Sequence, residues 1–305
     1  MEWTRKTYDA AGLTQHPLGE HLVALQRLLG GSVLRCPDGM SVYEHVIWAI
    51  ENEAISELRA LLTNKSVWKV RNFDKNQLPN PMQAALNGCG QDKVTPVFQM
   101  LVQNRFQFDE QDEHGWRPLV GAVLLGNVNA ARLFLESGAS IEWNTTDDFS
   151  HTWMSALHAL PFMPASVGGF ETMVDLLMER GAKLNPVHGV PPLHGVVNFA
   201  FRTGPDVCNS RIESLISRGA NINHRGALPF GLMPVPFYGR PLHAYYGSGR
   251  KVVEKLLELG ADANLTDSSG RNAEEFFLAY REKSRGERDE LEAILAMLRK
   301  KRKAG

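Results

Sequence analysis

The chain has 305 residues, of which 43% are hydrophobic and 22% are charged, and its formal net charge is -1. These proportions are ordinary for a folded protein, and the small net charge supplies no field that would attract nucleic acid or an anionic membrane surface. No stretch approaches the roughly 20 apolar residues that a membrane span requires. The first residues also lack the apolar run of a secretory signal peptide. We therefore expect a cytoplasmic protein with no membrane segment and no nucleic-acid partner.

The first helical pattern in the chain is Pro17–Leu29, which places four leucines on one face and ends at Gly30-Gly31. A fold that is open at its ends needs a cover over its terminal apolar surface. We therefore expect residues 1–40 to form a capping helix region, with an independent functional arm as the alternative.

Two pairs of short helices are predicted next. Tyr43–Leu62 favours one pair, and a second pair begins at Asn80-Pro81 and ends with the helix Pro96–Gln103. Asn104 follows that helix, and we expect it to take the left-handed conformation in which glycine is usual, because asparagine also visits that region. In the first pair, the residues expected to face inward are Val46, Ala49, Ile50, Leu58, Leu61 and Leu62.

A pattern of two short helices punctuated by glycine then recurs four times. The clearest copy is RPLHAYYGSGRKVVEKLLELGADAN, at Arg240–Asn264. A single helical hairpin cannot bury both of its apolar faces, so neighbouring copies are required. The other copies join Arg117–Val123 to Ala130–Glu142, Ser155–Pro161 to Met173–Asn185, and Pro191–Val197 to Ile212–Asn223.

The spelling of these copies resembles the ankyrin repeat, in which Thr-Pro-Leu-His-x-Ala is followed by Leu-Leu-x-x-Gly-Ala-Asp-x-Asn. The Gly-Ala dipeptide recurs at Gly138, Gly181, Gly219 and Gly260. The resemblance implies an all-α solenoid of about seven stacked helix-turn-helix repeats over residues 41–283, four of them clear, with extended turns and loops between repeats. It also implies an interaction scaffold that binds a protein partner through its concave groove and inter-repeat loops.

The end of the chain predicts a last, incomplete repeat and a closing helix. Asp267 begins that repeat, and Glu274–Tyr280 is its first helix. Residues 284–305 are expected to form a C-terminal capping helix with a basic tail. The run Arg299–Lys303 is either a nuclear-import signal or the solvated end of this helix, where cations complement the helix dipole. The apolar stripe of the capping helix is Leu291, Ile294, Leu295 and Leu298.

The spacing of the repeats predicts insertions in the central part of the chain. The shared leucine recurs at steps of 38, 36 and 49 residues, whereas the ideal period is 33. Two inserts, 143–153 and 224–239, lie between repeats and would flank the concave groove. Two others, 162–169 and 198–208, lie between the two helices of one repeat.

The insert at residues 224–239 is rich in apolar side chains and in proline. Such side chains must bury against something, so they either cover the neighbouring repeats or wall a pocket and grip a partner. We expect the binding residues to come from the inserts and turns, where large aromatic side chains are the usual anchors. The candidates are Trp116, Trp143, Phe149, Trp153, Phe162, His188, Phe230, Phe237 and Tyr238.

The sequence favours a non-catalytic, monomeric protein without a cofactor or metal. His158, His194 and His243 occupy the Pro-Leu-His position, where the resemblance implies hydrogen bonds to adjoining turns. The three cysteines lack metal-ligand spacing and are expected to be structural. The alternative is a cofactor-independent enzyme or a binder of a hydrophobic small molecule, in which a loop histidine acts as acid or base. Its candidate residues would be His188, His224 and Asp148.

Overall fold

The computed structural model describes residues 42–63, 81–90, 93–106, 108–110, 117–144, 153–166, 168–186, 191–198, 200–227, 238–239, 249–281 and 288–304. These residues form helices and two short two-stranded antiparallel sheets. The chain has two compact bodies, Met1–Pro118 and Leu119–Gly305, called here the N-terminal and the C-terminal body. The expected helix at residues 17–29 lies outside the described residues.

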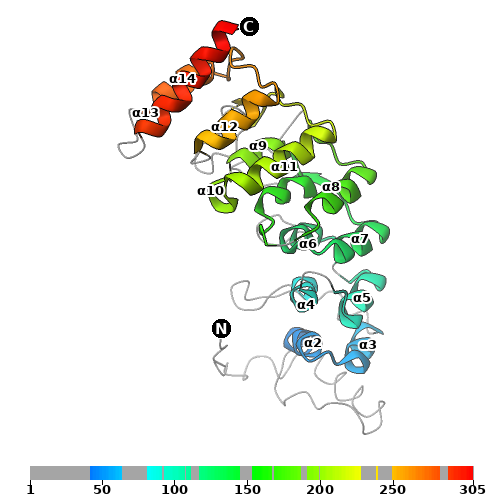
Figure 1. Cartoon of the computed structure of the whole chain (residues 1–305). Helices are drawn as coiled ribbons and strands as arrows, with labels where there is room; N and C mark the ends of the chain where they lie inside the picture. Colours follow the sequence, from blue (N-terminus) through cyan, green and yellow to red (C-terminus); the bar gives the residue numbers. More distant parts are fainter. Residues whose placement is uncertain are drawn as a thin grey trace. The chain divides into compact units, whose positions relative to one another are not determined.

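Figure 1 shows the helices, most of them short and joined in pairs by tight turns. The elements are α2 (Val42–Glu51), α3 (Ile55–Thr63), α4 (Pro81–Cys89), α5 (Pro96–Gln103), α6 (Pro118–Leu125), α7 (Val128–Glu136), β1 (Glu142–Asn144), β2 (Trp153–Ser155), the 3₁₀ helix η3 (Ala156–Phe162), α8 (Phe170–Glu179), α9 (Pro192–Asn198), α10 (Ala200–Thr203), α11 (Pro205–Ser217), β3 (Gly226–Ala227), β4 (Tyr238–Gly239), α12 (Gly249–Glu258), α13 (Ala273–Arg281) and α14 (Arg288–Ala304).

The N-terminal body contains the two repeats predicted from the weakest sequence patterns. Helix α2 packs on α4, and α3 packs on α5, so equivalent helices of consecutive repeats stack on one another. The six residues that we expected to face inward from α2 and α3 are all buried, which confirms the predicted faces. Their exposed fractions are 2% for Val46, 0% for Ala49, 5% for Ile50, 0% for Leu58, 2% for Leu61 and 6% for Leu62.

One titratable pair is buried in this body. His45 Nε2 lies 3.9 Å from Glu57 Oε1, and each residue is 5% exposed. Burial lowers the pKa of His45 and raises the pKa of Glu57, so it favours the uncharged form of both side chains. At this distance the pair makes no hydrogen bond, and we count it as a cost to the stability of the repeat.

The prediction that Asn104 takes the left-handed conformation is wrong. Asn104 has φ −82°, and the left-handed residue is Arg105, at φ +56°. The amide of Arg105 donates to the carbonyl of Val102, as the amide of Gly138 donates to Leu135 in the next repeat. Arg105 therefore stands where the four clear repeats carry glycine, one residue later than the sequence pattern suggested.

A second non-glycine residue takes this conformation in the N-terminal body. Glu53, at φ +51°, lies in the turn between α2 and α3. Gly126, at φ +70°, occupies the corresponding turn between α6 and α7. An L-residue with a side chain is strained in the left-handed region by roughly 1–2 kcal/mol relative to glycine, so both turns are weaker than their glycine-containing counterparts.

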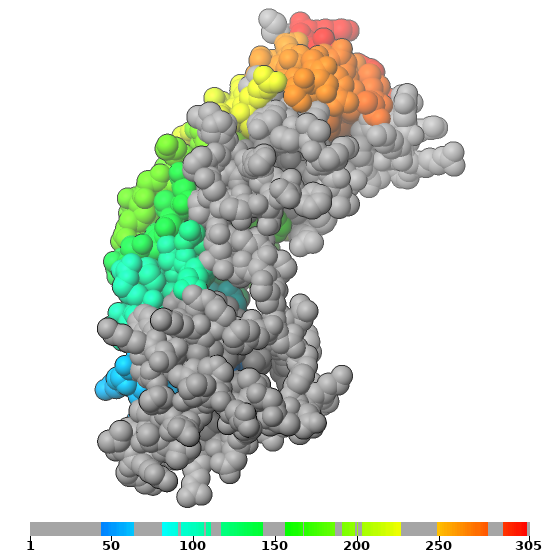
Figure 2. Space-filling model, turned by 180° about the vertical axis from the view of Figure 1, so that it is seen from behind, coloured from blue at the N-terminus to red at the C-terminus, as the bar shows by residue number. Residues whose placement is uncertain are grey.

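In the C-terminal body the repeats stack in chain order. Helix α9 packs on η3, α11 on α8 and α12 on α11, and α14 packs on both α12 and α13. Figure 2 shows the described residues of this body following one another from green to red. The stripe expected on the closing helix is buried, with Leu291 6% exposed and Ile294, Leu295 and Leu298 0% exposed.

Two helices of this body differ from the expected pattern. Where an α-helix was expected from the segment SALHALP, Ala156–Phe162 forms a 3₁₀ helix, and it includes Pro161, which has no amide hydrogen to donate. The insert at residues 198–208 is largely helical, because α10 fills its first half and α11 already begins at Pro205. The second helix of this repeat therefore starts seven residues before Ile212, where the pattern placed it.

Candidate functional site

The insert at residues 143–153 rises from an antiparallel hairpin. Strands β1 and β2 pair Glu142 with Ser155, Trp143 with Met154 and Asn144 with Trp153. The amide of Ala156 donates to the carbonyl of Ile141 at 3.0 Å, which continues the pairing beyond the strands. The two tryptophans that we proposed as anchors thus belong to a paired stem, for which the structure describes the backbone.

The insert at residues 224–239 has the same construction. Strands β3 and β4 pair Gly226 with Gly239 and Ala227 with Tyr238. A side chain on Gly226 would collide with Pro191, so only glycine allows the hairpin to approach the preceding repeat this closely. Both inserts between repeats therefore begin and end in hydrogen-bonded strands.

His224 lies two residues before β3, the first strand of this second hairpin, and it is half-buried. Its Nε2 atom lies 2.9 Å from the carbonyl oxygen of Pro186, in the preceding turn. Because a carbonyl only accepts, Nε2 carries the proton in this hydrogen bond. The ring of His224 also meets the fully buried ring of His194 edge-on, with centroids 6.3 Å apart. In this structure His224 therefore ties one turn to the next, a role that the sequence did not reveal.

A chain of asparagine hydrogen bonds connects the same turns. Asn185 Nδ2 donates to the carbonyl of Gly219 at 2.9 Å, and its Oδ1 accepts from the amide of Asn221 at 2.7 Å. Asn223 makes the equivalent two bonds one repeat later, at 3.4 and 2.9 Å. We call this series the asparagine ladder; it fixes the spacing of the turns from which the second hairpin emerges.

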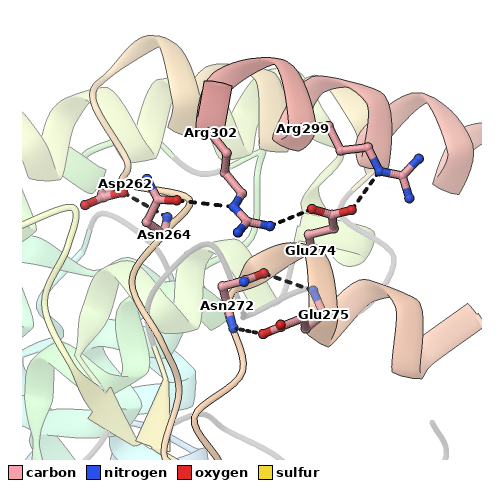
Figure 3. Close-up of polar contacts among 7 residues, drawn as sticks. All are labelled: Asp262, Asn264, Asn272, Glu274, Glu275, Arg299 and Arg302. Carbon is pink, nitrogen blue, oxygen red and sulfur yellow. Dashed lines mark hydrogen bonds and ion pairs between the residues drawn. The ribbon is translucent and has the colours of Figure 1, made fainter. Parts of the chain in front are cut away.

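The last step of the ladder is closed by α14 (Figure 3). Arg302 Nε donates to Asn264 Oδ1 at 3.2 Å, and its Nη1 donates to Glu274 Oε2 at 2.8 Å. Arg299 holds the other oxygen of Glu274 at 2.7 Å. The hydrogen bond from Arg299 is the largest cause that lowers the pKa of Glu274, and the hydrogen bond from Arg302 lowers the pKa further.

The close-up also shows how α13 begins (Figure 3). The amide of Asn272 donates to Glu275 Oε2 at 2.9 Å, and the amide of Glu275 donates to Asn272 Oδ1 at 3.1 Å. This reciprocal pair satisfies two amides that would otherwise lack partners at the helix start. The basic run therefore docks on a well-formed terminal repeat.

The inserts within repeats form a second ordered region. Arg211, on α11, is 4% exposed, and its Nη2 donates to the carbonyl oxygens of Met163 and Pro164 at 2.8 and 3.3 Å. Its guanidinium also lies 4.8 Å from the centre of the Phe170 ring. Arg211 was not predicted from the sequence, although its spacing from the buried Cys208 and Leu215 fits the inward face of a helix.

Cys208 is fully buried beside this arginine, and burial raises the pKa of its thiol to about 12. Its thiol donates to the carbonyl of Val196 at 3.5 Å. Since the thiolate is the reactive form, this cysteine is structural, as expected. Cys89 is buried as well.

The structure brings only part of the proposed site into view. Phe162 and His224 are described with their side chains, and Phe162 is 39% exposed. Trp143, Trp153 and Tyr238 are described by their backbone, in β1, β2 and β4. The proposed residues outside the described ones are Trp116, Phe149, His188, Phe230 and Phe237, together with the alternative acid–base residue Asp148.

No group of three or more histidine, cysteine, aspartate or glutamate residues in the described part of the chain could hold a metal ion. No described helix combines the length and apolar character needed to cross a bilayer.

The paired short helices, the stacked equivalent helices and the turns tied by the asparagine ladder define a helical repeat protein. Comparison with solved structures identifies the kind of repeat. The ankyrin repeat domain of human ASB11 superposes with a TM-score of 0.54 at 16% identity, covering 86% of this chain and 97% of that domain. The ankyrin repeat domain of Bcl-3, described as a unique member of the IkappaB protein family, gives 0.53 at 21% identity, covering 86% and 99%.

The chain therefore has the ankyrin-repeat fold, which confirms the predicted fold class. The sequence itself matches no family model, and no curated protein matches it significantly. At these identities the likeness shows the fold alone, and the function has to be argued from the surfaces of this chain.

Proposed function

We propose that the chain is a non-catalytic scaffold that binds a protein partner through its concave groove and inter-repeat loops. One observation carries this proposal: both inserts between repeats begin and end in paired antiparallel strands. Such stems fix both ends of each insert to the frame of the repeats. Fixing the ends reduces the conformational entropy that an insert loses when it binds, which suits it to holding a partner.

The residues on these stems support the same proposal. Trp143, Trp153 and Tyr238 lie on the strands themselves. Tryptophan and tyrosine dominate binding energy at protein interfaces because they offer a large apolar surface and a polar atom. We therefore propose these three side chains, with the insert residues beyond them, as the main contacts of the partner.

No observation favours the enzymatic or small-molecule alternative as a second function. Of its three acid–base residues the structure describes His224, whose Nε2 already serves the bond to Pro186. If His224 exchanged the Nε2 proton with a substrate, it would lose the hydrogen bond to Pro186 that connects the two turns. The pocket hypothesis stays a prediction about residues 187–190 and 228–237.

We further propose that the protein acts in the cytoplasm as a monomer and that its basic tail can carry it into the nucleus. Two of the five basic residues, Arg299 and Arg302, are docked on Glu274, whereas Lys300, Lys301 and Lys303 are exposed. A fluorescent fusion with Lys300, Lys301 and Lys303 changed to alanine should lose nuclear signal; unchanged nuclear signal would contradict import by this run.

The main proposal can be tested by shortening one hairpin. Gly226 and Gly239 are opposite each other, so residues 227–238 can be replaced by Asn-Gly, which closes a two-residue turn. Partners are captured from the native host with the wild type, with this variant and with Arg132→Ala, an exposed change on α7. We expect a defined set of proteins to be lost from the hairpin variant alone, with an unchanged circular-dichroism spectrum. Identical sets for all three would contradict the proposal.

A further inference from the structure

The basic run Arg299–Lys303 is helical, because α14 continues to Ala304. Successive side chains of an α-helix point about 100° apart, so five consecutive residues surround the whole helix axis. The five cations of the run therefore face in all directions, and no single binding surface can contact them together. In an extended segment alternate side chains point to the same side, and this is the form that a peptide-binding groove accepts.

The run lies beyond the apolar contacts of α14. Leu298 ends the apolar stripe of this helix and is 0% exposed, whereas all five residues of the run are exposed. Burial of apolar surface therefore does not hold the run on the fold. A short stretch of helix is marginal in water when nothing packs against it, and helix ends open more readily than helix centres. The helical form of the run then depends on the polar contacts that its side chains make.

Glu274 supplies most of these contacts (Figure 3). One oxygen of its carboxylate accepts from Arg299 Nε at 2.7 Å, and the other accepts from Arg302 Nη1 at 2.8 Å. The side chain of Glu274 is 14% exposed, so both hydrogen bonds are partly shielded from water. Arg302 Nε also donates to Asn264 Oδ1. Two arginines thus tie the end of α14 to α13 and to the turn that follows α12.

The carboxylate also offsets repulsion within the run. Residues three or four positions apart are neighbours on the surface of a helix, and like charges at these spacings destabilise it. Arg299 has such a spacing to both Arg302 and Lys303. Because Glu274 contacts Arg299 and Arg302 at once, its negative charge favours the helical form of the run against this repulsion.

We infer that the docking of α14 on Glu274 and Asn264 masks the import signal, and that the run is bound by its receptor only after the end of the helix leaves these two residues. This inference rests on the role in nuclear import proposed above for the run. A receptor that takes the run in extended form must break the arginine contacts. Its apparent affinity is therefore reduced by the fraction of molecules in which the end is released. The receptor that fits is one with an acidic groove along an extended backbone.

The first measurement asks whether these contacts hold the end of α14. Hydrogen–deuterium exchange of the amides of residues 300–304 is compared in the full chain of wild type, Glu274→Gln, Asn264→Ala and Glu254→Gln. Glu254 is an exposed carboxylate on α12, so its change removes the same charge from a neighbouring helix and is the matched control. The amides of α12 in the same samples report any general loss of structure.

We expect the amides of residues 300–304 to exchange about fivefold faster in Glu274→Gln and about twofold faster in Asn264→Ala. Glu254→Gln should exchange like wild type, and the amides of α12 should be unchanged throughout. Wild-type exchange of residues 300–304 in both Glu274→Gln and Asn264→Ala would overturn the inference. Equal acceleration in α12 would also overturn it, because the contacts would then hold the whole terminal region and not the run.

The second measurement follows localisation of the full chain with a fluorescent protein at its N-terminus, away from the run. We expect the nuclear-to-cytoplasmic ratio to rise about twofold to fivefold in Glu274→Gln, in step with the released fraction, and to stay unchanged in Glu254→Gln. The rise should disappear when Glu274→Gln is combined with Lys300→Ala, Lys301→Ala and Lys303→Ala. A rise that survives these three changes would show that entry does not use the run, and would refute the masking.

The lysine variant without Glu274→Gln keeps the two proposals apart. If its nuclear signal falls and Glu274→Gln gains none, the run imports the protein and the masking is refuted. If its nuclear signal equals that of wild type, import by the run is refuted and the masking falls with it. A fall in the lysine variant together with a gain in Glu274→Gln supports both.

Discussion

Arg302 donates a hydrogen bond from Nε to Oδ1 of Asn264, 38 residues earlier in the chain. Asn264 occupies the position of Asn185 and Asn223, which use the same atom to hold the amide of the next repeat. At the last repeat a guanidinium from α14 takes the place of that amide. The closing helix therefore caps the polar ladder as well as the apolar core.

Removal of this cap should weaken the end of the fold. Arg302→Ala eliminates the bond to Asn264 and the ion pair with Glu274, and we expect a loss of about 1 kcal/mol in the free energy of unfolding. Lys301→Ala is the control, because Lys301 is exposed on the same helix, and it should change the value by less than about 0.5 kcal/mol. Urea unfolding followed by circular dichroism gives both values; equal effects would show that the contact with Asn264 contributes nothing.

Glu274 should make the stability depend on acid. Arg299 and Arg302 lower its pKa in the folded state below the ordinary value of 4.5. A carboxyl with a lowered pKa stabilises the fold above its unfolded pKa, and this contribution disappears as the pH falls through the folded pKa. Wild type should therefore exceed Glu274→Gln in melting temperature at pH 7, and the difference should shrink as the pH falls below 4.5 and through the folded pKa. A difference that persists in acid would assign the effect to packing.

The turn at Glu53 offers a stabilising substitution. Glu53→Gly removes the strain of a side-chain-bearing residue in the left-handed region, and it should raise the free energy of unfolding by about 1 kcal/mol. The neighbouring change Asn52→Gly is the control: Asn52 lacks a positive φ and donates to the carbonyl of Trp48, so this change should destabilise. Arg105→Gly should give a smaller gain, because the guanidinium of Arg105 lies 4.3 Å from the centre of the Phe108 ring and that contact would be lost. Thermal unfolding ranks the three variants.

Gly195 and Gly88 should respond oppositely to a methyl group. An added Cβ at Gly195 would come within 2.5 Å of Pro161, whereas nothing lies within 4 Å of the corresponding position at Gly88. Gly195→Ala should cost about 1–3 kcal/mol through overpacking. Gly88→Ala, on an exposed face of α4, should stabilise by about 0.5–1 kcal/mol because alanine favours the helix. If Gly195→Ala is equally stabilising in chemical denaturation, the close packing of α9 on η3 is refuted.

The repeat pattern predicted the fold because it shows which residues of each helix are buried. Leucines at helical spacing show which face of a helix packs inward, and this held even for Leu58 and Leu61 in a repeat without the usual motifs. It did not show which residue ends a helix. Asn104 and Arg105 are adjacent, and only alignment of Leu101 with Phe134, whose carbonyls accept equivalent amides, assigns the left-handed position to Arg105.

The candidate site was less predictable, because long-range contacts determine it. The sequence showed where the inserts lie, but not that their ends pair as strands, since strands of two or three residues are too short to show a period. It also gave no reason to connect Arg211 with Met163, 48 residues away. One local signal was present and was not used: Gly204-Pro205 is typical of the start of a helix, and α11 begins there.

The positive φ angles of Glu53 and Arg105 have a consequence for how the chain opens. Both residues lie in the N-terminal body, which also contains the buried pair of His45 and Glu57. In repeat proteins each repeat contributes its own stability and that of its neighbour contacts, so local defects are not averaged over the whole chain. We expect the amides of α2–α5 to exchange with deuterium before those of α11 and α12. An unfoldase or a protease would then act first on the N-terminal body, while the repeats that carry the two hairpins are still folded.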